Sequence, residues 1–226
     1  MDLPVWQALY SELEAKNFVV ITVALDTAGV AAAGQWIEKA QPTYPCLIDT
    51  EHIVADLYGM VNVPQAVWID EEGKIVRPTE TAGTTDGFRH MDRTKSTMPP
   101  EVLADLRATR RTYLDALRDW AENGAESRYA LNDAERLARL TPTTFDDQMA
   151  RAHFTLGEYL HEEGRPNEAQ VEFAEAKRLH PESWEFARQA WALEDPPKSG
   201  GPEFWAAVAA LGEKRYYAPV RLTADV

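Results

Sequence analysis

The chain has 226 residues, with 23 Lys and Arg against 37 Asp and Glu, which gives a formal net charge of −14. Apolar residues make up 45% and charged residues 27%, so the sequence can form a hydrophobic core in one large domain or two small ones. The acidic balance argues against partners that present phosphates. We therefore expect it to bind no nucleic acid and no anionic membrane surface.

The sequence shows no recognisable targeting signal or membrane segment. No stretch approaches the ~20 apolar residues of a transmembrane helix, and residues 1–4 (MDLP) lack the basic segment of a signal peptide. We expect no membrane segment in this chain, and the compartment is unknown, with the cytoplasm as the default. Cys46 is the only cysteine, which excludes an internal disulfide, a CxxC redox pair and a cysteine-based zinc site.

Residues 1–78 alternate helical and strand-like patterns, which indicates an α/β layered structure. The continuous apolar run at 18–25 predicts a strand covered on both faces. In the helix after it, Trp36 and Ile37 are expected to face inward. Gly73 ends a tight hairpin turn over residues 70–73. The patterns predict helices at 4–16, 31–40 and 51–58, strands at 18–25, 65–69 and 74–77, and a short apolar segment at 46–48.

A polar stretch rich in Gly and Pro follows at residues 79–100 and predicts a loop and a domain boundary. We accordingly expect one domain at residues 1–95 and a second, all-helical domain at 101–226. One apolar stripe of this domain recurs at helical spacing and consists of Phe145, Met149, Ala152, Leu156 and Leu160. The helices are expected at 101–122, 125–140, 145–160, 169–179, 182–193 and 202–211.

Residues 150–183 resemble one tetratricopeptide repeat. Gly157 and Ala169 stand where two helices approach closely, Phe173 where a ring fills the groove between them, and Pro181 where the second helix stops. At the fourth position of the repeat, where an aromatic residue is usual, this chain has His153. Two interpretations stay open: the helices are a cap on the first domain, or they form a groove that docks a partner peptide.

The first domain resembles the TlpA/ResA-like thioredoxin-fold (redoxin) proteins. The match rests on residues 4–10 (PVWQALY), residues 18–26 (FVVITVALD) and above all residues 58–76 (YGMVNVPQAVWIDEEGKIV). The resemblance implies a thioredoxin-like three-layer domain, thiol–disulfide exchange and protein thiol or disulfide substrates. It further implies that Pro64 is a cis-proline, that the backbone of Val63 pairs with extended substrates and that Trp6 borders the substrate groove.

The departure from that family is equally informative. A strand and a W-C-x-x-C motif precede the first helix in the family, and neither stands ahead of residue 4 here. We therefore assign no catalytic residue, and we expect the domain to lack its first strand. Because that strand occupies the middle of the sheet in this fold, its loss leaves unpaired backbone groups on its two neighbours. We expect one of three outcomes: a sheet with a gap, a re-pairing of strands 18–25 and 65–70, or a swapped homodimer that supplies the missing edge.

Two explanations of this departure stay open. In one, the reading frame starts upstream, for instance because an in-frame UGA that encodes selenocysteine was read as a stop, as expected for a ResA-like selenoprotein. In the other, the chain is a truncated, redox-inactive protein. The alternative function is then a non-catalytic scaffold that binds a partner through the helical repeat domain.

The remaining candidate residues favour structural roles. Cys46 follows Tyr44-Pro45 on an apolar segment and is interpreted as a buried structural thiol. Asp26 closes a strand and is interpreted as a turn or cap residue. The five histidines show no metal-binding spacing, so we expect no metal and no other cofactor.

Overall fold

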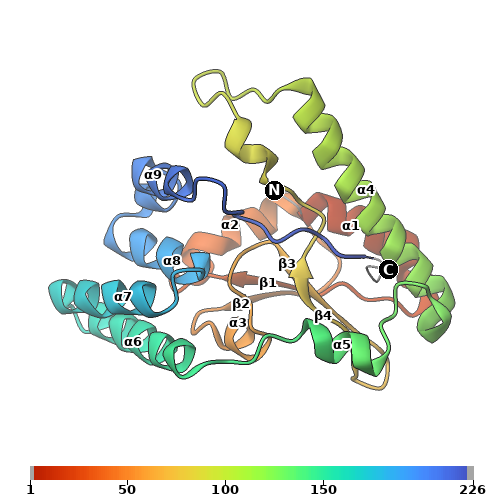
Figure 1. Ribbon diagram of the computed structural model, residues 1–226, viewed down its shortest axis with the longest axis horizontal. Helices are drawn as coiled ribbons and strands as arrows, with labels where there is room; N and C mark the ends of the chain where they lie inside the picture. The colour runs from red at the N-terminus through yellow and green to blue at the C-terminus, as the bar shows by residue number, and fades with distance from the viewer. Residues whose placement is uncertain (1–2, 223–226) are drawn as a thin grey trace. The chain divides into compact units, whose positions relative to one another are not determined.

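Tertiary contacts group the chain into two units, each assembled from separate stretches of sequence. The computed structural model describes residues 3–222, and Figure 1 shows its helices and strands. Unit 1 consists of residues 3–20, 64–140 and 213–222, and unit 2 of residues 21–63 and 141–212. The domain boundary expected between residues 95 and 101 concerns the linear organisation of the chain and stays a prediction.

Unit 1 combines an antiparallel hairpin with helices. Strands β3 (Gln65–Ile69) and β4 (Ile75–Thr81) pair with Ile69 opposite Ile75, and Gly73 takes a φ of 79° in the turn between them, as predicted. The helical elements are α1 (Leu3–Leu13), η1 (Glu14–Lys16), η2 (Asp86–His90), α4 (Pro100–Asn123), η3 (Gly124–Glu126) and α5 (Asp133–Arg139).

Unit 2 combines a parallel strand pair with helices from both halves of the chain. Strands β1 (Thr22–Leu25) and β2 (Cys46–Asp49) pair with Leu25 opposite Asp49. The helical elements are α2 (Val30–Ala40), α3 (Ile53–Leu57), α6 (Phe145–Glu162), α7 (Pro166–Leu179), α8 (Trp184–Glu194), η4 (Pro196–Ser199) and α9 (Pro202–Ala210). No helix of the described residues is long and apolar enough to cross a bilayer.

The described strands form two separate two-stranded sheets. β1 pairs only with β2, and β3 only with β4, so the expected alternative of pairing between segments 18–25 and 65–70 does not occur within residues 3–222. Each of these four strands thus has one edge without a strand partner in the described chain. The mixed α/β class expected from the sequence is confirmed.

Several local predictions are wrong. The strand predicted at 18–25 begins only at Thr22, and its residues are half-buried, while Val19 and Ile21 are 57% exposed. A two-stranded sheet offers too little surface for both faces of a strand to be covered. Trp36 is 48% exposed, and the small Ala33 is the residue of α2 that is buried.

The segment predicted as a loop at 79–100 is in part ordered structure. β4 continues to Thr81, and a 3-10 helix follows at Asp86–His90. The carboxylate of Asp86 accepts hydrogen bonds from the backbone N–H groups of Tyr216 and Tyr217, at 2.9 and 2.7 Å. This stretch therefore anchors the C-terminal segment of unit 1.

The core of unit 1 forms around Trp68 and Tyr113. The indole Nε1 of Trp68 donates to the hydroxyl of Tyr113 at 2.9 Å, and its ring stacks on Trp120 with centroids 5.2 Å apart. Leu9 and Leu13 of α1 complete this core, which explains the periodic apolar face predicted for residues 4–16. Burial raises the pKa of the Tyr113 phenol well above its ordinary value.

A fully buried arginine ties unit 1 together. The guanidinium of Arg77 donates to both carboxylate oxygens of Glu80, at 2.9 and 2.7 Å. It also donates to the carbonyls of Tyr129 (2.8 Å), Arg221 (2.6 Å) and Leu222 (3.4 Å). Five contacts satisfy a charge that could not be buried alone.

The core of unit 2 depends on the hairpin of α6 and α7. A Cβ added to Gly157 would lie 2.5 Å from Cε1 of Phe173, so the ring occupies the space that the glycine leaves free. The ring of Phe154 stacks on Phe186 of α8, with centroids 4.5 Å apart. The close approach predicted at Gly157 is confirmed.

We predict that Arg77→Met strongly destabilises unit 1, because the carbonyls of Tyr129 and Arg221 lose their buried donor and Glu80 keeps only its longer ion pair with Arg139, at 3.7 Å. The expected loss is about 3–5 kcal/mol in the free energy of urea unfolding. Arg118→Met is the control, since Arg118 makes a comparable ion pair with Glu12 at 2.8 Å at the surface. It should cost about 1 kcal/mol or less. Equal losses in the two variants would contradict this account.

We predict that Gly157→Ala destabilises unit 2 although alanine favours helix. The new methyl group overlaps the ring of Phe173, and overpacking of this kind costs about 1–3 kcal/mol. Phe173→Leu removes the clashing atoms, so the double variant should lose less stability than the two single losses added together. Thermal or urea unfolding of the four proteins measures this coupling. Strict additivity would show that the two side chains do not interact.

Candidate functional site

The carboxyl ends of β1 and β2 lie at one edge of the parallel pair, where binding sites of α/β proteins usually form. Asp26 follows β1, and its Oδ1 accepts from the backbone N–H of Ala28 at 3.0 Å, the turn contact predicted for it. Asp49 ends β2, and its carboxylate accepts from the backbone N–H groups of Ile53 (3.0 Å) and Val54 (2.7 Å), which caps α3. Local polar contacts therefore shape both loops.

His52 occupies the second of these loops and is almost completely buried, with 1% of its surface exposed. Its backbone adopts a positive φ of 55°, which directs the chain from β2 into α3. The ring packs edge-on against Phe154, with centroids 5.4 Å apart. A buried imidazole at a strand end is the feature of unit 2 that most resembles a functional group.

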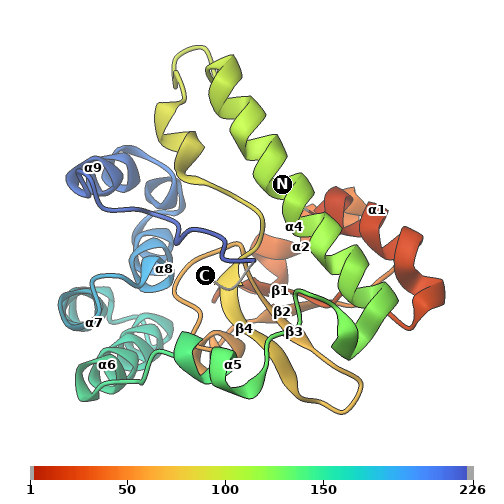
Figure 2. The ribbon, with the colours of Figure 1, turned by 45° about the vertical axis from the view of Figure 1, so that its right-hand side comes forward.

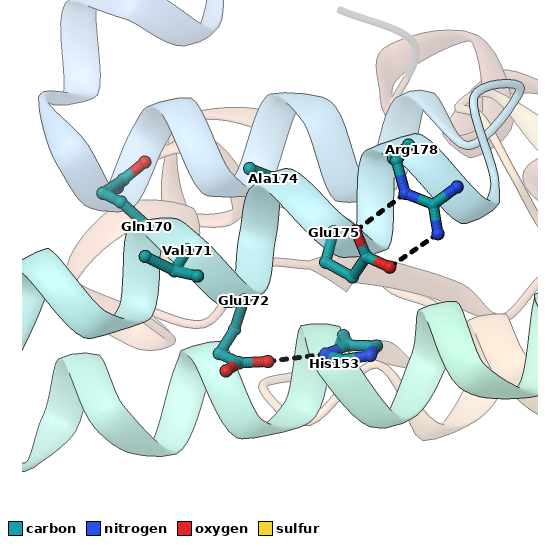
Figure 3. A pocket seen from close by; sticks show the side chains of 7 residues that line it. All are labelled: His153, Gln170, Val171, Glu172, Ala174, Glu175 and Arg178. Atoms are coloured by element: carbon teal, nitrogen blue, oxygen red, sulfur yellow. Dashed lines mark hydrogen bonds and ion pairs between the residues drawn. The ribbon is translucent and has the colours of Figure 1, made fainter.

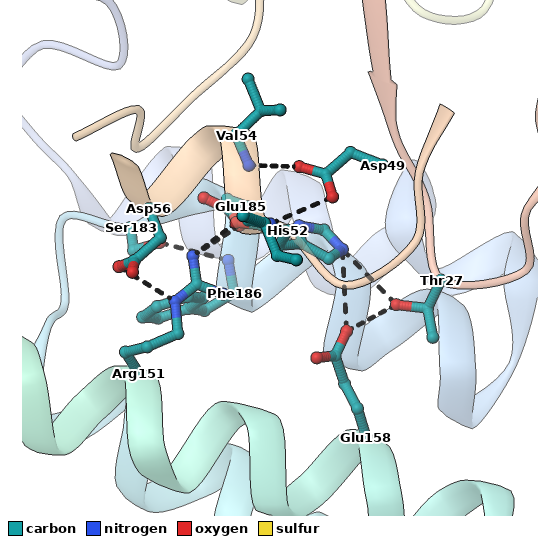
Figure 4. A network of polar contacts seen from close by, with 11 residues as sticks. Thr27, Asp49, His52, Val54, Asp56, Arg151, Glu158, Ser183, Glu185 and Phe186 are labelled. Atoms are coloured by element: carbon teal, nitrogen blue, oxygen red, sulfur yellow. Dashed lines mark hydrogen bonds and ion pairs between the residues drawn. The ribbon is translucent and has the colours of Figure 1, made fainter. Parts of the chain in front are cut away.

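Two carboxylates from the helical half of the chain flank this imidazole (Figure 4). His52 Nδ1 lies 2.7 Å from Oε1 of Glu185 on α8, and Nε2 lies 3.7 Å from Oε1 of Glu158 on α6. The hydroxyl of Thr27, in the loop after β1, donates to the same Glu158 oxygen at 2.6 Å. Both strand-end loops are thus tied to two helices.

Arg151 completes the network from α6. Its Nη2 donates to the carbonyl of His52 (3.1 Å) and to Oε1 of Glu185 (3.5 Å), and its Nε donates to Asp56 (3.3 Å). The guanidinium lies over the ring of Phe186, 5.1 Å from its centroid. A nearby main-chain bond, from Glu185 N–H to the Val61 carbonyl at 3.1 Å, attaches the start of α8 to the same region.

Burial raises the pKa of Glu158 above its ordinary value. The hydrogen bond from Thr27 and the electrostatic interactions with His52 and Arg151 act in the opposite direction, and the neighbouring Glu185 adds to the rise. Burial has the largest effect, because the hydration energy that the carboxylate loses exceeds the stabilisation that these partners provide.

This network is built to hold segments together. Its side chains bond to one another, and none of them lines the hollow on the α6–α7 hairpin or the small cavity beside Trp6. Within residues 3–222, no three His, Cys, Asp or Glu side chains are placed so that they could hold a metal ion. We therefore interpret the cluster as a clasp between the strand-end loops and α6 and α8.

A second feature is a wide, shallow hollow of about 610 Å³ on the α6–α7 hairpin (Figure 3). Ion pairs border it: His153 Nδ1 lies 2.6 Å from Glu172, and Arg178 donates to Glu175 at 2.6 and 2.8 Å. Its charged groups are paired and it is open to solvent, so it does not enclose a ligand. The residues that line it are His153, Gln170, Val171, Glu172, Ala174, Glu175 and Arg178.

The residues predicted to bind substrate fall in different units. Trp6 is half-buried in unit 1 and lines a cavity of about 10 Å³, room for about one water molecule. The carbonyl of Pro64, also in unit 1, accepts from Ala82 N–H at 3.1 Å. Val63 belongs to unit 2, its N–H donates to Oδ1 of Asn62 at 2.9 Å, and its side chain is 42% exposed. Their role in substrate binding stays a prediction.

Cys46 begins β2, at the opposite end from the His52 network. The thiol is half-buried, and the hydroxyl of Thr22 donates to its sulfur at 3.0 Å. Burial, with a smaller contribution from Cys46, raises the pKa of nearby Tyr44 to about 12. The thiol is therefore less buried than expected, and its structural role stays a prediction.

Sequence reasoning missed the clasp. Glu158, Glu185 and Arg151 lie in polar stretches of amphipathic helices and carry no spacing signal. One sign was available, because Glu158 falls between Gly157 and Leu160 on the face of α6 that is buried. A charged residue on the buried face of a helix requires a hydrogen-bond or ion-pair partner, although the sequence does not identify that partner.

We predict that Glu158→Gln changes the pH dependence of stability. A raised pKa in the folded state means that the wild type loses stability as pH rises from the ordinary carboxyl value of 4.5 through the folded value. The neutral amide does not titrate, so the variant should match the wild type near pH 4 and exceed its melting temperature at pH 8. Glu162→Gln, at an exposed site on the same helix, is the control. A Glu158→Gln protein that is less stable at pH 8 would show that the ion pairs outweigh burial.

Comparison with known proteins identifies the N-terminal part of the chain. The sequence profile of the AhpC/TSA family matches residues 2–77. No curated protein and no solved structure matches the chain. The matched segment covers the helix, strand and hairpin motifs of residues 4–76 described above. Residues 2–77 are therefore a redoxin domain of the AhpC/TSA family.

Proposed function

We propose that this chain is part of a thiol–disulfide oxidoreductase of the TlpA/ResA-like kind and that residues 1–226 lack its nucleophile. The AhpC/TSA match to residues 2–77 carries this proposal. The finer assignment rests on residues 58–76 and on the hairpin that they enter, where β3 and β4 are joined through Gly73. In this reaction a thiolate attacks a disulfide sulfur, and a second thiol resolves the mixed disulfide.

The 226-residue chain should not catalyse that exchange. Its single thiol, Cys46, is half-buried on a strand and bonded to a threonine hydroxyl, and no second cysteine exists to resolve a mixed disulfide. Reactive cysteines usually lie at helix N-termini or beside cations, where the thiolate is stabilised. Cys46 begins β2, away from any such position.

The strand edges support a missing segment. In the described chain β1 and β3, like β2 and β4, each have one edge without a strand partner. By the family resemblance, one strand ahead of the first helix would pair with both and would carry the W-C-x-x-C motif or a selenocysteine form of it. Val63, Pro64 and Trp6 would then border the substrate, with Pro64 as a cis-proline.

The second candidate is a non-catalytic scaffold. It is favoured by the α6–α7 hairpin, in which Phe173 fills the space over Gly157 as in the tetratricopeptide frame. In that case the helical part docks a partner peptide and the redoxin domain supports it. The two candidates differ in one respect that can be measured, because only the first requires a redox-active residue.

We predict that the 226-residue chain does not reduce insulin disulfides, and that Cys46→Ser leaves this unchanged. A protein extended upstream through the preceding reading frame should reduce them, because it regains the nucleophile and the strand. Turbidity from precipitated insulin B chain measures the reaction. The same extended protein with its first redox residue changed to Ser is the matched control.

The upstream nucleotide sequence gives an independent test. An in-frame Cys codon pair or UGA codon ahead of Met1 supports the redox candidate. A stop codon other than UGA, with no W-x-x-(C/U) coding sequence, eliminates it and leaves the scaffold. An extended protein that carries the motif and still fails to reduce insulin would also count against the redox candidate.

A further inference from the structure

The clasp of unit 2 buries more negative charge than positive charge. The side chains of Glu158 and Glu185 are 9% and 3% exposed, and His52 lies between them. Arg151 supplies one positive charge, since it donates to Glu185 and lowers the energy of the Glu158 carboxylate. Two ionised carboxylates and one guanidinium would leave a net negative charge, which is costly to bury.

The other charged groups around the clasp make this imbalance larger. Asp26 stands next to Thr27, Asp49 ends β2, and Asp56 lies on α3, so all three are acidic. The carboxylates of Asp26 and Asp49 accept from backbone N–H groups, which are neutral donors. Asp56 is 59% exposed and shares Arg151 with Glu185. None of the three brings a positive charge, so a proton is needed to balance the buried carboxylates.

The hydrogen bonds around the His52 ring also require a further hydrogen. Nδ1 lies 2.7 Å from Oε1 of Glu185, which accepts, so Nδ1 carries a hydrogen. On the other side of the ring, Nε2 lies 3.4 Å from Oγ1 of Thr27, and that oxygen lies 2.6 Å from Oε1 of Glu158. These two contacts need two hydrogens, and the Thr27 hydroxyl supplies one. The second must come from the ring or from the carboxyl group.

That second hydrogen has two possible positions. In the first, Nε2–H donates to Thr27, whose hydroxyl donates to ionised Glu158. In the second, protonated Glu158 donates to Thr27, whose hydroxyl donates to the neutral ring. Movement of two hydrogens along this line of atoms converts one arrangement into the other with no net gain of protons. Each arrangement adds one proton to the clasp, and the burial that raises the pKa of Glu158 favours its retention.

We propose that the clasp closes with one proton, shared by His52 and Glu158 through Thr27, and that loss of this proton as pH rises releases the loop after β1 from α6. Without the proton, the single hydrogen of the Thr27 hydroxyl faces two acceptors. The Glu158 carboxylate then gains more from water than from its partners. Glu185 keeps both His52 Nδ1 and Arg151, so the loop after β2 stays in place.

The direction of the pH effect follows from the proton count. The closed clasp binds one proton more than the open one, so closure weakens by up to about tenfold per pH unit once the open form has lost that proton. In Figures 1 and 2 the helices α6, α7 and α8 form a row beside the segment that carries β1, β2 and α3. Opening therefore gives access to the carboxyl end of β1, an edge at which α/β proteins bind ligands.

NMR of the full chain, labelled with nitrogen-15 and carbon-13, tests for the proton at about pH 7, where an ordinary glutamate is ionised. We expect either both ring nitrogens of His52 or the carboxyl group of Glu158 to be protonated, and not both groups together. Loss of one signal in Glu158→Gln identifies the carboxyl group. A neutral ring beside an ionised Glu158 overturns the proposal, and so does a charged ring beside a protonated Glu158.

Hydrogen exchange tests the opening. The amide of Gly29 lies in the loop after β1 and donates to the carbonyl of Asp26 at 2.9 Å. Its protection factor should fall at least tenfold between about pH 6 and about pH 9. The amide of Glu185, which donates to the Val61 carbonyl at 3.1 Å, is the internal reference and should change by less than about twofold.

Two variants separate the shared proton from a general effect of pH. Glu158→Gln carries no excess charge and its amide can donate to the ring, so Gly29 should stay protected at both pH values. Glu162→Gln, at an exposed position of α6, should behave as the wild type. Constant protection of Gly29 in the wild type, or an equal fall in Glu158→Gln, overturns the proposal. None of these measurements depends on redox activity, so they test the clasp separately from the proposed function.

Discussion

Each unit of this protein is assembled from segments far apart in the sequence, and in each a buried polar side chain with partners from several segments joins them. In unit 1, Arg77 gathers the carboxylate of Glu80 and main-chain carbonyls near residues 129 and 221–222. In unit 2, His52 lies between Glu158 and Glu185. A polar side chain that is removed from water must find hydrogen-bond partners in the protein, so these contacts determine which segments meet.

The consequence for function is that the redoxin domain is not structurally independent of the helices that follow it. Residues 2–77 match the AhpC/TSA family, yet the strand-end loops of their parallel pair are closed by α6 and α8. The edge at which α/β proteins usually bind ligands is occupied by a clasp. In the described residues, each strand of the two sheets has one edge to which a further strand could be added.

Much of the local structure could be predicted because it depends on local physics. Gly73 marks the hairpin turn, and Gly157 marks a close helix approach, since no side chain can replace the missing Cβ at either place. Exposure was predicted less well. Trp36 was expected inside because of its place in a helical pattern, but such a pattern identifies an apolar face without stating whether a neighbour covers it.

The sequence by itself determined the class of secondary structure, the family of the first 77 residues and the presence of only one thiol, because propensities, motifs and composition are properties of the chain alone. Tertiary structure decided which segments share a unit, that Glu158 and Glu185 meet His52, and that Phe145 and Leu156 on α6 stay exposed. Those outcomes depend on contacts between residues more than 100 positions apart, as from His52 to Glu185, and no periodicity records such contacts.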